Sequence, residues 1–217
     1  MPGIDAGDFG AWLLATHAAL RGSGGSAVPC GDCTGCCTSG YSIEVRPGDA
    51  AALRCIPASA LSGSITRAAG HWTVRPDGHG VCPMLDCGRC SIYAERPQTC
   101  RDYDCRVFAA AGIEAGGADK SVINERVRQW RFRFSREQDV LVHDAIRAAA
   151  HFIREGRAYF PAGSVPRTPL GIAALAVRVY PVFLPPGPPA DPQALARAVL
   201  ETAAAFDRGA VHADQSR

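Results

Sequence analysis

The stretch CGDCTGCC, residues 30–37, places four cysteines within eight positions, two of them side by side. Cys30, Cys33 and Cys36 follow a C-x2-C-x2-C spacing, and each C-x2-C turn brings two sulfurs toward one centre and aims backbone N–H groups at them. Thiols at this density can form disulfides, a redox relay or a metal site. The chain has 217 residues, 47% of them hydrophobic, which is enough for a core that needs no cross-links.

The N-terminal sequence favours metal ligation or catalysis over disulfides. Asp5 and Asp8 stand where a signal peptide carries positive charge, His17 interrupts the apolar part, and no segment reaches the ~18 apolar residues of a membrane span. We therefore expect a cytoplasmic protein that does not associate with membranes, in which thiols stay reduced. The net charge of +2 gives no indication of a nucleic-acid binder.

The adjacent pair Cys36-Cys37 separates this motif from a ferredoxin segment. Bacterial ferredoxins share the C-x2-C-x2-C spacing, but here Cys37 follows at once and no Cys-Pro comes three residues later. Neighbouring side chains of an extended segment point to opposite sides. We expect one sulfur in the knuckle and the other facing a second centre or the core, and a buried, non-ligating Cys37 stays open.

A second group of cysteines lies between residues 82 and 105. Cys82, Cys87 and Cys90 match the plant-type [2Fe–2S] spacing C-x4-C-x2-C, but Asp86-Cys87-Gly88 is typical of a hairpin turn, where Cys87 would be incidental. Cys100 and Cys105 complete the group, and Cys55 lies outside both groups.

Short elements are expected around the cysteines and helices after them. The predicted elements before residue 106 are a helix over 8–20, strands over 41–45 and 71–75, a hairpin partner over 80–85 and a small helix over 50–55. Ile123, Val127, Trp130 and Phe134 fall on one helical stripe. The arginines of RVRQWRFRF (126–134) then lie on the other faces of this helix. We expect them to face solvent or a partner protein, and we do not expect nucleic-acid binding there.

Capping signals predict the later helices. Ser135–Gln138 is a capping-box pattern that should start a helix ending at Gly156, with Leu141, Ala145, Ala148 and Phe152 on one face. Thr168-Pro169 should start the next helix, and Asp191-Pro192 a last one that ends near Gly209.

These patterns predict an α+β fold, in which a small cysteine-rich metal-binding lobe with short strands and loops packs against C-terminal α-helices. The expected regions are an N-terminal helix and flexible linker (1–27), the cysteine-cluster region (28–106), a helical region packed on it (107–184), and a Pro-rich linker, terminal helix and tail (185–217).

The motifs CGDCTGCC, GVCPML and CSIYAERPQTCR together resemble the CxxCxxCC cysteine-cluster family, often called YkgJ-type and described as zinc- or iron-chelating proteins. The resemblance covers roughly residues 28–106. By position it implies metal ligation by the following cysteines: Cys30, Cys33, Cys36, Cys37, Cys82, Cys90 and Cys100, with Cys105 as an eighth. His71 and His79 are less favoured candidates, either of which could replace a cysteine as a zinc ligand.

The expected function is an intracellular metal-binding protein with a redox, sensing or structural role, holding an iron–sulfur cluster or, second, zinc. Flagellin lysine N-methylases carry a similar cluster, so the resemblance leaves open a protein-modifying enzyme that uses S-adenosylmethionine. A zinc-stabilised interaction module, with a protein partner on the helical region, is a further alternative. The sequence does not decide whether the protein is an enzyme. Among the nearby arginines, Arg96 and Arg101 should hydrogen-bond carbonyls of the Pro97 turn.

Overall fold

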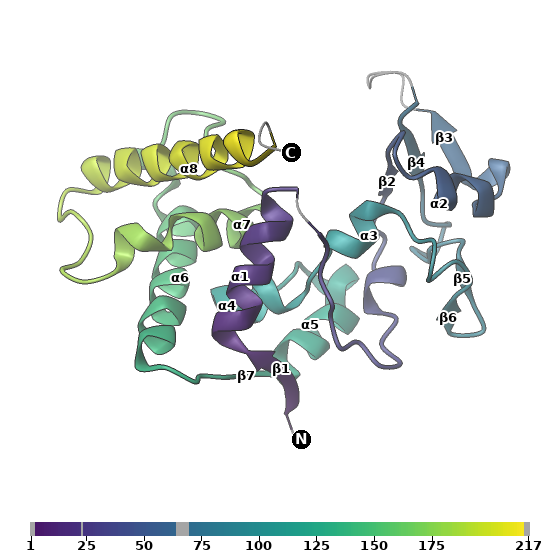
Figure 1. The fold of residues 1–217 in the computed structure, drawn as a ribbon, viewed down its shortest axis with the longest axis horizontal. Helices are drawn as coiled ribbons and strands as arrows, with labels where there is room; N and C mark the ends of the chain where they lie inside the picture. Colours follow the sequence, from purple (N-terminus) through teal and green to yellow (C-terminus); the bar gives the residue numbers. More distant parts are fainter. Residues whose placement is uncertain (1–2, 23, 64–69, 215–217) are drawn as a thin grey trace. The chain divides into compact units, whose positions relative to one another are not determined.

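The computed structural model describes residues 3–22, 24–63 and 70–214, with side chains described as far as residue 209. The chain divides into two compact units (Figure 1). The helical unit consists of Met1–Gly24, Cys105–Ala115 and Val127–Arg217, and the cysteine-rich unit consists of Gly25–Asp104 and Gly116–Arg126. Helices together with a few short strands confirm the α+β class.

The cysteine-rich unit is built from short elements. Its elements are η1 (Gly35–Cys37), β2 (Ile43–Val45), α2 (Ala50–Cys55), η2 (Ala58–Ala60), β3 (Leu61–Gly63), β4 (Trp72–Val74), β5 (Leu85–Asp86), β6 (Arg89–Cys90), α3 (Gln98–Asp102) and η3 (Ala118–Lys120). Helix α5 (Ser121–Gln129) begins in this unit and ends in the helical unit.

A three-stranded antiparallel sheet in the order β2-β4-β3 supplies the core of the cysteine-rich unit. The prediction that residues 80–85 pair with the strand 71–75 is wrong, because β4 already has partners on both edges. The buried core residues are Val45, Ala52, Ile56, Val74, Met84 and Ile92. Cys82 and Cys90 pack against this small core, so it positions two of the predicted ligands.

The helical unit holds the remaining elements, which Figure 1 shows grouped around α7. They are β1 (Ile4–Asp8), α1 (Phe9–Leu20), α4 (Arg106–Ala111), β7 (Trp130–Arg133), α6 (Glu137–Glu155), η4 (Arg157–Tyr159), α7 (Pro169–Val179), η5 (Tyr180–Phe183) and α8 (Pro192–Asp214). Helix α7 contacts α1, α4, α6 and α8, which accounts for its nearly continuous apolar sequence.

Two helices start at the predicted capping signals, Thr168-Pro169 and Asp191-Pro192, and the predicted helix over 8–20 starts with a cap that the sequence analysis did not name. Asp8 caps α1 by accepting from the Ala11 N–H (2.9 Å). Thr168 caps α7 through the Gly171 N–H, with Pro169 in the first turn. Asp191 accepts from Ala194 at the start of α8 (2.9 Å), and this helix continues past the expected end at Gly209 to Asp214. The tail beyond Asp214 lies outside the described residues.

The expected helical stripe through Phe134 is wrong beyond Gln129. Trp130–Arg133 forms strand β7, which pairs in parallel with β1 in a register that joins Ile4 to Trp130. Here buried or half-buried aromatic residues alternate with exposed arginines, a period of two that suits a strand once β1 offers hydrogen bonds.

Helix α6 forms as expected, but its capping box does not. It begins at Glu137, and no side chain caps it, because the Ser135 hydroxyl donates instead to Asp8 Oδ2 (2.5 Å). Its buried face is centred on Val142, Ile146, Ala149 and Ile153, whereas Leu141 is 42% exposed. This face packs against α4 and α7 of its own unit. No described helix has the length and apolar character needed to cross a membrane.

Candidate metal centre

The first cysteines lie in a compact turn held by its own backbone. The Cys33 N–H donates to the Cys30 carbonyl (3.1 Å), and the Cys37 N–H donates to the Thr34 carbonyl (2.8 Å). The Gly35 N–H points at Cys33 Sγ (3.4 Å), as the C-x2-C spacing predicts. A donor in this position stabilises negative charge on the sulfur.

Gly35 lets the turn pack closely on α5. A Cβ at position 35 would lie 3.2 Å from Ile123 Cγ1, closer than most neighbours tolerate, and 3.5 Å from Cys33 Sγ, an ordinary van der Waals distance. The Ser39 hydroxyl donates to the Gly35 carbonyl (2.6 Å), and the Lys120 ammonium donates to the Ser39 carbonyl. Residues 116–126 thus support the cysteine turn from outside its own segment.

The Sγ atoms of Cys36 and Cys37 lie 3.9 Å apart. The pair sits in the 3₁₀ turn η1, so the expectation of sulfurs on opposite sides, which assumed an extended backbone, is wrong. Two thiolates on one tetrahedral ion, each bonded at about 2.3 Å, would be about 3.8 Å apart. A disulfide needs about 2.05 Å. The pair therefore has the spacing of two ligands of one ion.

Backbone hydrogen bonds attach the second cysteine group to this turn. The Cys82 N–H donates to the Cys37 carbonyl (2.7 Å), and the Gly40 N–H donates to the Gly80 carbonyl (2.9 Å). Cys90 ends β6 opposite Leu85 of β5. The hairpin therefore presents Cys82 and Cys90 next to the first group.

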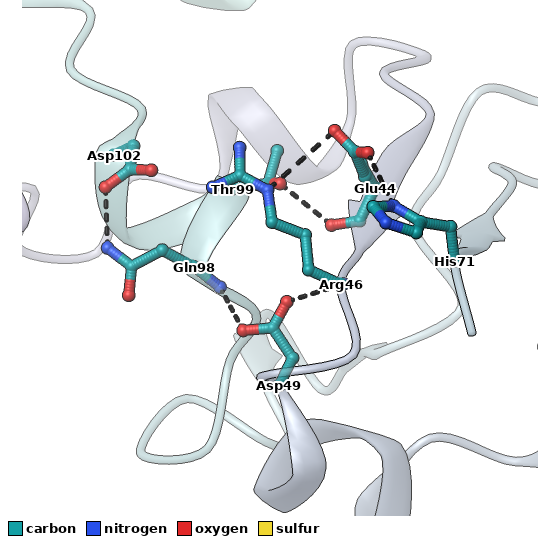
Figure 2. Close-up of polar contacts among 7 residues, drawn as sticks. All are labelled: Glu44, Arg46, Asp49, His71, Gln98, Thr99 and Asp102. Carbon is teal, nitrogen blue, oxygen red and sulfur yellow. Dashed lines mark hydrogen bonds and ion pairs between the residues drawn. The ribbon is translucent and has the colours of Figure 1, made fainter. Parts of the chain in front are cut away.

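Cys100 is placed by helix α3, which a network of side chains fastens to β2 and α2 (Figure 2). Asp49 Oδ1 accepts from the Gln98 N–H (2.9 Å), and Asp49 Oδ2 accepts from the Arg46 N–H (2.8 Å). The Thr99 hydroxyl donates to the Glu44 carbonyl (2.8 Å). Sequence reasoning missed Asp49, Thr99 and Glu44, because nothing in their spacing indicates partners about fifty residues apart.

The turn before α3 is held by arginines, as predicted. Arg96 Nη1 donates to the Tyr93 carbonyl (2.7 Å), and Arg101 Nε donates to the Arg96 carbonyl (3.0 Å). Arg101 Nη2 also donates to the Ala94 carbonyl. These bonds fix the chain on both sides of Pro97 and so the start of the helix that carries Cys100.

The pKa shifts of the cysteines indicate which thiols lie close enough to repel one another when they ionise. Burial, together with repulsion from Cys36 and Cys33, raises the pKa of Cys30 to about 11. Burial, together with repulsion from Cys36, Cys82 and Cys90, raises the pKa of Cys100 to about 12. Cys36 takes part in both groups, and its own pKa is raised chiefly by the hydrogen bond with the Cys37 thiol.

Cys82 completes this picture. Burial raises its pKa, the Met84 N–H lowers it, and Cys90 and Cys36 raise it again. The cysteine-rich unit thus brings together seven thiols that the sequence proposed as ligands: Cys30, Cys33, Cys36, Cys37, Cys82, Cys90 and Cys100.

The donor set suits a soft or borderline metal. Gathered thiols repel one another once ionised, and a bound cation would remove that repulsion while accepting the thiolates. Over the described ranges, no three Cys, His, Asp or Glu side chains stand in a finished ligand geometry.

The other three cysteines lie elsewhere. Cys87 is exposed in the turn between β5 and β6, with φ +44°, as the hairpin prediction requires, and Cys55 is exposed at the end of α2. Cys105 belongs to the helical unit, where it is buried and its Sγ accepts from Trp130 Nε1 (3.3 Å).

The two less favoured histidines have other partners. His71 Nδ1 lies 3.2 Å from Glu44 Oε1. His79 sits in the turn where its N–H donates to Asp77 Oδ1 (2.9 Å). Both contacts are ordinary structural ones, and neither involves a cysteine.

Comparison with known proteins gives one match. Residues 29–125 match the model of the CxxCxxCC family, whose description is "Putative zinc- or iron-chelating domain". No curated protein and no solved structure matches the chain. The matched segment contains both cysteine groups and most of α5, so it extends beyond residue 106, where the motif resemblance ended. Residues 29–125, somewhat under half of the chain, are therefore similar to the CxxCxxCC family.

Proposed function

We propose that the cysteine-rich unit binds a metal centre through the seven gathered thiols, and that this centre holds more than one metal ion. The observation that carries the proposal is the position of Cys36. Its thiol raises the pKa of both Cys30 and Cys100, and its Sγ atom lies 3.9 Å from that of Cys37. Four thiolates complete one tetrahedral zinc site. Seven exceed that number, which favours an iron–sulfur cluster, with zinc as the second candidate.

The proposal leaves Cys105 out of the ligand set. Its thiol already accepts a hydrogen bond in the core of the helical unit, whereas the seven other thiols influence or touch one another in the cysteine-rich unit. A bound iron–sulfur cluster would supply one-electron transfer, and bound zinc would supply structural stability. The seven thiols would hold the centre, and the hydrophobic core against which Cys82 and Cys90 pack would shield it from water on that side.

The test is purification of the full chain without oxygen, followed by absorption spectroscopy and analysis of iron, sulfide and zinc. A brown protein with matched iron and sulfide would support the cluster, and a colourless protein with stoichiometric zinc would replace it by the second candidate. Cys36→Ser should lose metal, whereas Cys55→Ser, a change at an exposed cysteine outside both groups, should keep it. Metal-free protein, or equal metal in both variants, would overturn the proposal.

A further inference from the structure

The helical unit contains a pocket that the metal centre does not use. It encloses about 420 Å³ between α4, the end of α5, β7 and α6. This volume lies within the range of about 300–1,000 Å³ that small-molecule sites span. Every residue that lines the pocket belongs to the helical unit, so its shape depends on that unit alone.

Four phenylalanine or tryptophan side chains are among the lining residues of the pocket. Phe108 and Trp130 are buried, and Phe132 is half-buried. Phe134 is 40% exposed, and its ring lies 5.2 Å from that of His143, centroid to centroid. An exposed phenylalanine beside buried rings offers a surface on which a flat apolar ring can stack.

Three arginines also line the pocket, and two of them have no acidic partner among the described residues. Arg128 pairs with Glu114 (2.9 Å). Arg131 Nη1 is held by the carbonyls of Arg128 and Trp130, both at 2.8 Å, and the Arg147 guanidinium lies against Gly112. Neither Arg131 nor Arg147 makes an ion pair with any described residue.

The pocket therefore carries excess positive charge. Three guanidinium groups and one carboxylate, that of Glu114, line it, which leaves two positive charges in excess. Burial lowers the pKa of His143, with a further lowering by Arg147 against an opposing effect of Asp144, so this ring is neutral near pH 7. Positive charge here comes from arginine, whose planar fork binds carboxylate or phosphate oxygens in pairs.

We propose that this pocket binds a small molecule in which a flat aromatic ring carries an anionic group. The ring stacks on Phe134, and the anionic group is bound by Arg131 and Arg147. A nucleoside monophosphate and an aromatic carboxylate share this chemistry. The proposal does not depend on the metal centre, since its residues lie in the other unit.

The test titrates the full chain with adenosine monophosphate and, separately, with indole-3-acetate, by calorimetry at fixed salt. Saturable one-to-one binding of either probe is expected below about 1 mM. Arg147→Glu and Arg131→Glu should each weaken binding at least about tenfold, since each removes a charge-assisted hydrogen bond. Arg197→Glu, an equal change of charge at an exposed position of α8 outside the pocket, should leave binding within about twofold.

The two probes distinguish the two kinds of ligand, and the variants test the proposal itself. Tighter binding of the monophosphate identifies a nucleotide-like ligand, and tighter binding of the carboxylate identifies an aromatic acid. Arg147→Gln, which keeps a similar shape without charge, covers the case in which the glutamate variants misfold, as judged by circular dichroism. If neither probe binds, or if Arg147→Glu and Arg197→Glu weaken binding equally, the proposal that this pocket binds an anionic aromatic molecule is wrong.

Discussion

Replacement of Asp49 by alanine should loosen the helix that carries Cys100. The carboxylate accepts two backbone N–H groups, from Arg46 at 2.8 Å and from Gln98 at 2.9 Å (Figure 2). Both bonds are partly exposed, so we assign each about 1 kcal/mol. Asp49→Ala should therefore lower the free energy of unfolding by about 2 kcal/mol. Asp49→Asn, which keeps one acceptor oxygen, should cost about half as much.

The assay combines urea unfolding of the full chain with hydrogen exchange of the segment 98–102. The segment should exchange faster in Asp49→Ala, because the Gln98 N–H loses its acceptor at the start of α3. Metal content after dialysis should also fall, since Cys100 lies on this helix. Asp86→Ala is the matched control, an exposed aspartate in the β5 hairpin.

Equal behaviour of the two variants would refute this reasoning. If Asp49→Ala and Asp86→Ala differ by less than about 0.5 kcal/mol, the range of ordinary surface changes, then the Asp49 bonds do not stabilise the unit. If stability falls but exchange at 98–102 is unchanged, then Asp49 acts on α2 alone and does not position Cys100.

Three further predictions concern the thiols and their supports. The metal-free protein should lose stability as pH rises above 9.0, the ordinary thiol pKa, because the folded state keeps Cys30 and Cys100 protonated up to pKa values of about 11 and about 12. Urea unfolding midpoints measured below and above pH 9 should show this loss. The double variant Cys30→Ser/Cys100→Ser should have a weaker dependence of stability on pH. Cys105→Ala should cost about 1 kcal/mol in urea unfolding, because it removes the hydrogen bond that Trp130 Nε1 donates to Cys105 Sγ. Metal content should stay unchanged, and loss of metal would return Cys105 to the ligand set. Thr99→Val should cost about 1 kcal/mol in urea unfolding, and a wild-type midpoint would show that its bond to β2 contributes nothing.

Local signals predicted much of this fold because they act within a few residues. Asp8, Thr168 and Asp191 cap helices from adjacent positions, so their effect is readable from spacing. The same holds for the Cys87 turn, where the two strands flank it directly.

Predictions failed where a distant partner changed the outcome. Trp130–Arg133 fits both a helical stripe and an alternating strand, and the N-terminal strand β1, far away in sequence, selects the strand. Ser135 has the pattern of a capping box, but Asp8 takes its hydroxyl. Pairing of β4 with β2 and β3 likewise depends on contacts that no local pattern specifies.

The candidate site divides in the same way. Spacing indicated the knuckle and its N–H donor to sulfur, while the Cys36–Cys37 geometry required knowledge that the backbone turns there. The inclusion of Cys100 in the group depends on Asp49 and Thr99, which fasten α3 to the sheet. The grouping of the cysteines along the chain was therefore readable from the sequence, and the distant side chains that hold α3 in place were not.

The most direct test of the central claim is X-ray absorption spectroscopy of the purified full chain at the edge of whichever metal it contains. Thiolate ligation predicts a first shell made of sulfur at about 2.3 Å, lost or reduced in Cys36→Ser and Cys37→Ser and intact in Cys55→Ser. A shell of nitrogen or oxygen at about 2.0–2.2 Å, or one that the cysteine variants leave unchanged, would contradict a metal centre built from these thiols.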